Sequence, residues 1–161
     1  MTGRRVMLGA ALLLAAMVLG VSGVALADKD GENGEKCTLA MLNGLYVFAA
    51  TGYTGLPVTS TSPAVPKAII ELIRFNGDGS LDVPGATRSV NGTITQIPAG
   101  GTGSYTVADL VPPDGACRGT ITFSPGGPHF DLFIAPKGER MWMIQTDTGN
   151  VFQGTATKVS H

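Results

Sequence analysis

Short apolar segments separated by turns rich in Gly and Pro follow one another along most of the chain. Alternation of apolar and polar residues is typical of strands that bury one face. On this pattern we expect strands at 44–53, 68–75, 80–83, 86–91, 93–97, 103–108, 118–124, 129–135, 139–146 and 150–159. One helical turn is expected at 38–43, before the first strand. Strands at this regular spacing predict a single all-β domain.

The predicted architecture is one antiparallel up-and-down β-barrel of about eight strands, with a β-sandwich as the alternative. Segments 68–75 and 129–135 favour the barrel, because both are so apolar that we expect them to be covered on both faces. Closure also removes exposed sheet edges. Asn91-Gly92 is predicted to form a hairpin turn, although Asn91-Gly92-Thr93 is formally a glycosylation sequon.

The first 27 residues have the features of a secretory signal peptide. Arg4 and Arg5 precede an apolar run that ends in the small-x-small sequence Ala25-Leu26-Ala27. We therefore predict export to the periplasm or the extracellular space, with no stable membrane span after cleavage. The paired arginines also fit a twin-arginine signal, so the export route stays open. An uncleaved anchor is the alternative, and the glycines within the run weaken it.

Removal of the first 27 of the 161 residues leaves 134, which divide into a polar, flexible N-terminus at 28–36 and a β-barrel domain at 37–161. The two arginines of the signal account for two of the 11 basic residues, so nine remain against 12 acidic residues, a net charge of −3. Without a basic cluster we expect no nucleic-acid partner. Gly and Pro make up 29 of the 134 residues, too many for long helices.

Cys37 and Cys117 are the two cysteines of the chain, and both lie in the predicted exported part. In an oxidising compartment two cysteines favour one disulfide. This disulfide would close a loop of about 80 residues and stabilise the fold by about 4 kcal/mol in the chain-entropy model. Neither cysteine belongs to a Cys-x-x-Cys pair, and few His or Cys residues accompany them, so we expect no metal site.

Candidate catalytic residues are few. His129 and Asp131 share one face of an extended strand, where the carboxylate could orient the imidazole of a general base. The alternative interpretation, which we favour, is a rim histidine beside a solvated aspartate. No nucleophile elbow or phosphate-binding loop is present, and no cofactor is expected. An enzyme is therefore less expected than a binding protein.

Glu71 is the third candidate, because it lies on the same strand face as Ile69, Ile73 and Phe75. A carboxylate among aliphatic side chains either pairs with a cation or has a raised pKa. We favour a buried structural pair with an arginine from Arg74, Arg118 or Arg140, and leave a ligand-anchoring role open.

Large apolar side chains gather at Met141-Trp142-Met143. Alternation places the two methionines on one face and Trp142 on the other, and such side chains either fill a core or line an adaptable pocket. If the barrel holds a ligand, we expect the lining to include Ile69, Glu71, Ile73, Phe133, Met141 and Met143.

Several motifs in a fixed order carry a family resemblance. They are Cys37 with 42–48 (LNGLYVF), 75–79 (FNGDG), 103–107 (GSYTV), 117–122 (CRGTIT), 144–149 (IQTDTG) and 154–156 (GTA). Together they resemble a group of uncharacterised exported bacterial proteins with a small β-barrel, over nearly all of 37–158. That barrel is similar to lipocalin-like (calycin) and allene oxide cyclase-like barrels. The family pattern often has Asp where this chain has Asn76. The resemblance implies fold and export, and it carries no activity or catalytic residue.

Three functional hypotheses follow. The first is an exported, non-catalytic barrel that binds a small apolar ligand. The second is an allene oxide cyclase-like isomerase or cyclase, with Glu71 or His129 transferring a proton. The third is an envelope protein with a purely structural role or one that associates with further copies of itself.

Overall fold

The computed structural model describes residues 36–57, 61–110 and 116–160. The predicted signal peptide and nearly all of the predicted N-terminal tail lie outside the described residues. The elements are η1 (Leu39–Leu42), β1 (Gly44–Thr54), β2 (Val65–Phe75), β3 (Ser80–Val90), β4 (Thr93–Ile97), β5 (Gly101–Asp109), β6 (Cys117–Ser124), β7 (His129–Ile134), η2 (Pro136–Gly138), β8 (Arg140–Gln145) and β9 (Asn150–Ser160). Within the described residues, no helix has the length and hydropathy needed to cross a bilayer.

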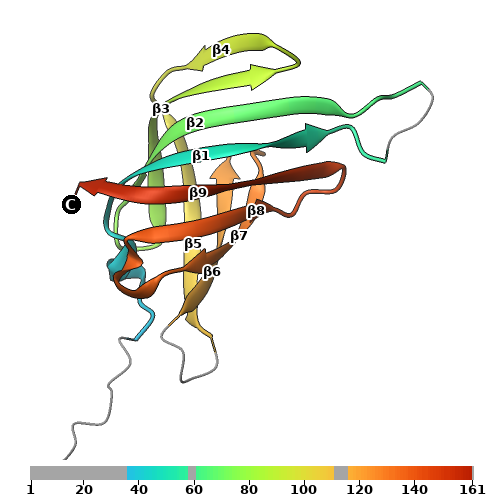
Figure 1. Cartoon of the computed structure of the whole chain (residues 1–161). Helices are drawn as coiled ribbons and strands as arrows, with labels where there is room; N and C mark the ends of the chain where they lie inside the picture. Colours follow the sequence, from blue (N-terminus) through green and yellow to red (C-terminus); the bar gives the residue numbers. More distant parts are fainter. Residues whose placement is uncertain (1–35, 58–60, 111–115, 161) are drawn as a thin grey trace, which may run out of the picture. The chain divides into compact units, whose positions relative to one another are not determined.

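Eight antiparallel strands close into a barrel, and β4 lies outside it (Figure 1). Neighbouring strands follow the order β2-β1-β9-β8-β7-β6-β5-β3, and pairing between β2 and β3 completes the ring. The prediction of an antiparallel barrel of about eight strands is confirmed, and the sandwich alternative is wrong. The helical turn expected at 38–43 is the 3-10 helix η1.

Inward-facing residues alternate with outward-facing ones along every strand of the barrel, which is the pattern that produces the core. Strand β7 shows it plainly, since Phe130, Leu132 and Ile134 are buried and the residues between them are exposed. The expectation that 68–75 and 129–135 are covered on both faces is wrong: Ile70 is 62% exposed and Phe133 is 53% exposed. These strands carry apolar residues on the outer surface.

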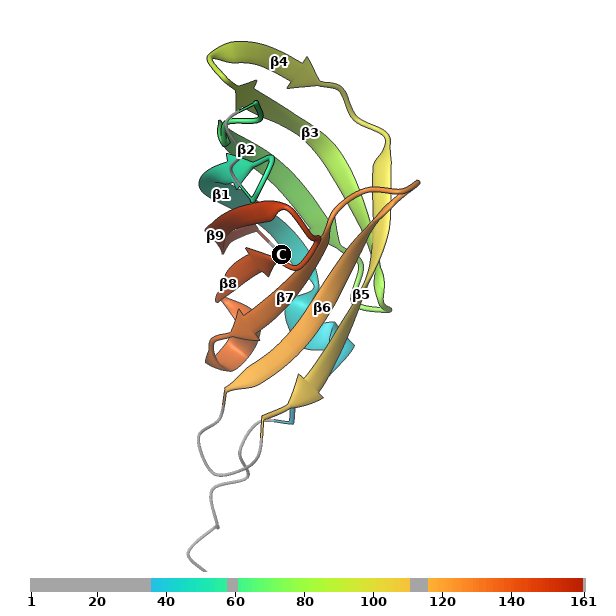
Figure 2. The same cartoon turned by 90° about the vertical axis from the view of Figure 1, so that its right-hand side faces the viewer.

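The segments expected as two strands, 80–83 and 86–91, form one strand, β3. Pro84 does not break it, because β3 changes partner at that point: Ser80–Val83 pair with β5, and Ala86–Val90 pair with β4. The β2 register also shifts between Leu72 and Arg74, opposite this point. Pro84 therefore occupies a position where the ladder needs no N–H donor. Figure 2 shows β4 beyond β3 at the edge of the barrel wall.

The expected hairpin turn between β3 and β4 is confirmed. Asn91 and Gly92 both have positive φ, 49° and 81°, as a two-residue hairpin turn with the twist of the flanking strands requires.

One end of the barrel, which we call the closed end, is filled by η1 and large side chains. Leu42, Tyr46 and Phe75 are fully buried there. Burial raises the pKa of Tyr46, so its hydroxyl stays protonated and donates a hydrogen bond to the Gly138 carbonyl oxygen. Gly138 has φ +67°, and a Cβ at this position would lie 2.5 Å from the Met41 carbonyl oxygen. The absence of a side chain at this glycine thus lets η2 pack directly on η1.

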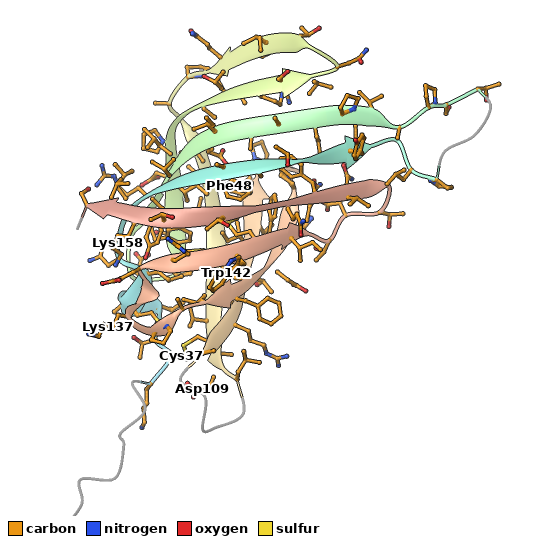
Figure 3. All side chains as sticks on the ribbon, viewed as in Figure 1. Cys37, Phe48, Asp109, Lys137, Trp142 and Lys158 are labelled. Carbon is orange, nitrogen blue, oxygen red and sulfur yellow. A yellow bond between two sulfur atoms is a disulfide. The ribbon has the colours of Figure 1, made fainter. Side chains whose placement is uncertain are left out.

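The predicted disulfide between Cys37 and Cys117 is present, with 5.7 Å between the two Cα atoms. It attaches the segment before η1 to the start of β6. The Cys37 backbone N–H also donates to the Asp109 carboxylate at 2.9 Å, and the two residues lie together at the lower end of the barrel in Figure 3. The N-terminal segment is therefore fixed over the closed end by a covalent bond and a hydrogen bond.

Candidate functional site

The opposite end of the barrel, which we call the open end, contains a cavity of about 580 Å³. Residues of β1, β2, β3, β5, β6, β7, β8 and β9 line this cavity, together with Ile97 of β4 and the β6–β7 turn. Its volume lies within the range of small-molecule sites in proteins. The interior of an eight-stranded barrel is wide enough either to be filled by side chains or to hold one small ligand. Here side chains fill the closed end, and the open end has space for a ligand.

Four phenylalanines form the apolar part of the cavity, which we call the aromatic floor: Phe48, Phe123, Phe130 and Phe152. Phe130 lies at its centre, with ring centroids 5.7 Å from Phe48, 6.0 Å from Phe123 and 6.4 Å from Phe152. The first two contacts are edge-to-face, which orients the rings as aromatic quadrupoles prefer. The four side chains are only 1–8% exposed, so the floor is a packed, preformed apolar layer at the base of the cavity.

Glu71 projects from β2 into this cavity, directly opposite Phe48 in the β1–β2 register. Its carboxylate has no hydrogen-bond or ion-pair partner among the described residues. Burial raises its pKa to about 7, because few water molecules solvate the charged form. The favoured pairing with Arg74, Arg118 or Arg140 is wrong, since all three arginines are exposed and none forms an ion pair with Glu71. The alternative of a raised pKa is confirmed.

Lys67 crosses the mouth of the cavity. It leaves β2 opposite Gly52, and its Nζ lies 4.2 Å from the ring centroid of Phe152 on β9. The ammonium donates hydrogen bonds to Gln145 Oε1 at 2.6 Å and to Asn150 Oδ1 at 2.8 Å. Burial lowers the pKa of Lys67, and the nearby Asp147 partly opposes this. One side chain thus connects β2 to β8 and β9.

Asp147 organises the rim next to Lys67. Its carboxylate accepts hydrogen bonds from Gln145 Nε2 at 2.7 Å and from the His129 backbone N–H at 2.9 Å. These hydrogen bonds lower the pKa of Asp147 to about 2. The His129 ring contributes a further contact, 2.6 Å between Nδ1 and Oδ1. The favoured interpretation of a rim histidine beside a solvated aspartate agrees with the structure, since His129 is exposed at the rim and Asp131 faces solvent on the outer surface. The alternative pair of His129 with Asp131 is wrong: Asp147, from the β8–β9 turn, contacts the His129 ring instead.

Arg88 is the remaining charged residue of the cavity lining. It lies on β3 opposite Ile69, one diagonal step from Glu71 on the same sheet face, and its side chain is exposed. Among the described residues it forms no salt bridge. In the part of the chain that the structure describes, Glu71 inside the cavity and Arg88 at its rim are therefore the two charged groups of the lining that form no side-chain hydrogen bond or salt bridge, whereas neutral amide oxygens bind Lys67.

The residues predicted to line a ligand site fall into three places. Ile69 and Glu71 line the cavity. Ile73, Met141 and Met143 lie in the packed core, almost completely buried. Phe133 lies outside the barrel.

An apolar groove of about 870 Å³ follows the outer surface, and we call it the outer groove. Phe133, Trp142 and Ile144 form one wall and Ile70 contributes to the other, with small residues such as Ala49 between them. Trp142 lies on the outer face of β8 in Figure 3, where it is 51% exposed. No charged residue lines this groove.

Sequence reasoning missed Lys67, Arg88 and Phe152, and it named Asp147 as a candidate acid without placing it beside His129. Lys67 lies on the same alternating face as Ile69 and Glu71, so the pattern of β2 contains a signal for it. Arg88, Phe152 and Asp147 reach the cavity through the registers of β3 and β9 and through the β8–β9 turn. The residue pattern of a single strand contains no information about the register between strands.

Among the described residues, no three His, Cys, Asp or Glu side chains lie close enough together to hold a metal ion. No protein-family model matches the sequence, and neither a curated protein nor a solved structure matches it significantly. The resemblance to exported small β-barrel proteins stays a prediction.

Proposed function

We propose that this protein is an exported, non-catalytic β-barrel that binds a small, largely apolar ligand in the cavity at the open end. The observation that carries the proposal is the cavity itself, with a floor of four phenylalanines and polar side chains such as Lys67, Glu71 and Gln145 around it. Burial of apolar surface supplies the main free energy of such binding, about 25 cal/mol per Å². The polar groups orient the ligand.

Titration with the neutral fluorophore Nile red tests this function, because its emission rises and shifts to the blue in an apolar site. Val90 lines the mouth of the cavity, so Val90→Trp places a large ring there. We expect it to weaken binding at least about tenfold, or 1.4 kcal/mol. Val151→Trp is the matched control, since Val151 is 56% exposed and belongs to neither the cavity nor the outer groove.

Thr54→Trp repeats the test from β1 if the first variant is poorly folded by circular dichroism. Equal affinities of the wild type and both cavity variants, or no binding to the wild type, would contradict the proposed function.

A second function, proton-transfer isomerisation, is favoured by the unpaired Glu71 in an apolar cavity. A carboxyl group with a pKa of about 7 can accept a proton from a substrate carbon and return it to another, a redox-neutral reaction. The exposed His129 at the rim does not support this role. A small β,γ-unsaturated ketone is the test substrate: its conversion to the conjugated isomer, followed by absorbance, should disappear in Glu71→Gln. A rate equal to that of buffer excludes the activity for this substrate.

A third function, self-association, is favoured by the outer groove. Its large wall residues adjoin a hollow of small residues, so the wall of one copy can fill the hollow of another across a two-fold axis. Sedimentation velocity should then show a mass that rises with concentration, and Trp142→Ser should abolish the rise while Val151→Ser preserves it.

A further inference from the structure

Three polar side chains of the cavity lining, Lys67, Gln145 and Asp147, already have partners within the protein. Lys67 is bound by Gln145 and Asn150, and Asp147 by Gln145 and His129. A ligand could recruit any of these groups only by breaking a hydrogen bond that exists without it. They are therefore part of the wall, and ligand selectivity depends on the groups that remain.

Of the charged groups of the lining, Glu71 and Arg88 remain, and they differ in hydration. Arg88 is exposed, so water solvates its charge. Glu71 is largely withdrawn from water and lies among Ile69, Ile73 and Phe48. A charged group that is poorly solvated gains more from a ligand partner than a solvated one does, because little hydration is lost on pairing. The stronger selection therefore comes from Glu71.

The surroundings of Glu71 specify the kind of partner. Its carboxylate accepts hydrogen bonds, and the aromatic side chain of Phe48 lies opposite it in the β1–β2 register. A carboxylate next to an aromatic ring is suited to an organic ammonium group. The rest of the aromatic floor lies within the same cavity and is available to the apolar part of the molecule.

We propose that the ligand is an amphipathic organic amine, with its ammonium group on the Glu71 carboxylate beside Phe48 and its apolar body on the aromatic floor. This inference rests on the proposed function and names the ligand class of the same cavity. The charged groups that face Glu71 are Lys67 on its own strand, Arg88 on β3 and Asp147 across the mouth. Lys67 and Asp147 contact the same Gln145 side chain, so their charges largely offset each other, and Arg88 is screened by solvent.

Isothermal titration calorimetry with octylamine, octanol and octanoate tests the proposal, because the three molecules share one chain and differ at the end group. At about pH 8.5, above the pKa of Glu71, octylamine should bind roughly tenfold or more tightly than octanol, as a charge-assisted hydrogen bond predicts. At about pH 5.5 Glu71 is protonated and the preference should shrink. Octanol binding should not weaken over the same range.

Glu71→Gln should abolish the preference for octylamine and keep octanol binding. Glu139→Gln is the matched control, because this carboxylate is exposed at the other end of the barrel. Octanol binding without a preference for octylamine, or a preference that survives in Glu71→Gln, would overturn the amine proposal and leave the proposed function intact. Tightest binding by octanoate, lost in Arg88→Gln, would overturn it in favour of an anionic ligand. If none of the three binds, the proposed function fails and the amine proposal fails with it.

Discussion

The closed and open ends of the barrel are formed by the same eight strands but by different kinds of residue. At the closed end, Leu42, Tyr46 and Phe75 are fully buried, and η1 and the disulfide cover them. At the open end, the charged Lys67 and Glu71 face inward next to phenylalanines.

This difference follows from access to water. A charged group inside a packed core has a large desolvation penalty, and no polar or charged residue is fully buried among the described residues. Inward-facing charges are tolerated only where the barrel opens. The closed end can therefore be tightly packed, which stabilises the fold. The open end keeps inward-facing groups that are free to interact with a ligand. Four predictions test this division, from the largest expected effect to the smallest.

Removal of the disulfide should have the largest effect. Replacing both Cys37 and Cys117 with Ser releases a loop constraint across a sequence separation of 80 residues, and we expect a loss of about 4 kcal/mol in the free energy of unfolding. Urea denaturation measures the change. Because the disulfide lies at the closed end, the affinity for Nile red should stay within about twofold at temperatures where the variant is folded. A loss of binding without a loss of stability would contradict the assignment of stability to the closed end and of ligand binding to the open end.

Truncation of one phenylalanine at each end compares them directly. Phe75 is fully buried and makes edge-to-face contacts with Tyr46 and Tyr105, so Phe75→Ala should cost about 3–4 kcal/mol. Phe152→Ala should cost clearly less, because the Phe152 ring already borders the cavity. Urea denaturation of both variants tests the order. Equal losses would mean that the open end is packed as tightly as the closed one.

Glu71 should make stability depend on pH in a defined window. Its pKa rises from 4.5 in the unfolded chain to about 7 in the folded protein, so the folded state holds the extra proton between these values. The free energy of unfolding should therefore fall as the pH rises from about 4.5 to 7, by up to about 3 kcal/mol, and stay level above it. Glu71→Gln should lack this fall and be more stable than the wild type at alkaline pH.

Asp147 affects the free energy of unfolding in a different pH range. Because its pKa is lowered in the folded protein, the stability that it contributes is lost only as the pH falls from about 3.8 toward 2. A fall between pH 4.5 and 7 that persists in Glu71→Gln would assign the effect to another group.

Lys67→Met should have the smallest effect. Methionine keeps the length of the side chain but removes the hydrogen bonds to Gln145 and Asn150, and we expect a loss of about 1 kcal/mol. Lys137→Met, at an exposed position in η2 of the closed end, is the control and should change stability little. Urea denaturation of Lys67→Met and Lys137→Met gives the two changes in the free energy of unfolding. A large loss in Lys67→Met would show that the open end contributes more to stability than its packing indicates.

Much of the fold could be predicted from alternation and turn residues alone. Strand β4 was predicted with its observed bounds, because the Asn91-Gly92 turn fixes where the hairpin reverses. The barrel was predicted for a reason that proved wrong, since the apolar residues on the second face of β2 and β7 lie on the outer surface. Pro84-Gly85 was interpreted as a break, because a pattern along one strand does not show that the strand changes partners there.

The candidate site was less predictable, because it depends on contacts between strands. The inward orientation of Glu71 follows from its alternation with Ile69 and Ile73, and this part could be predicted. Its lack of a cation partner could not, since that depends on where each arginine of other strands points. The partner of His129 lies 18 positions away, beyond the β7–β8 hairpin, whereas the sequence-based search considered its neighbour on the same strand face.

The change of partner along β3 has a consequence for how such a barrel can diversify. The half of β3 that pairs with β4 contributes Arg88 and Val90 to the mouth, and β4 contributes Ile97, yet β4 is not part of the closed ring. Ala86–Val90 also pair with β2 and so close the ring, but β4 and the Asn91-Gly92 turn do not. Insertions, deletions and substitutions in β4 and this turn can therefore reshape the mouth without breaking the hydrogen-bond ladder that closes the barrel. Natural variants that bind different ligands should accumulate their sequence differences in β4 and the turn first.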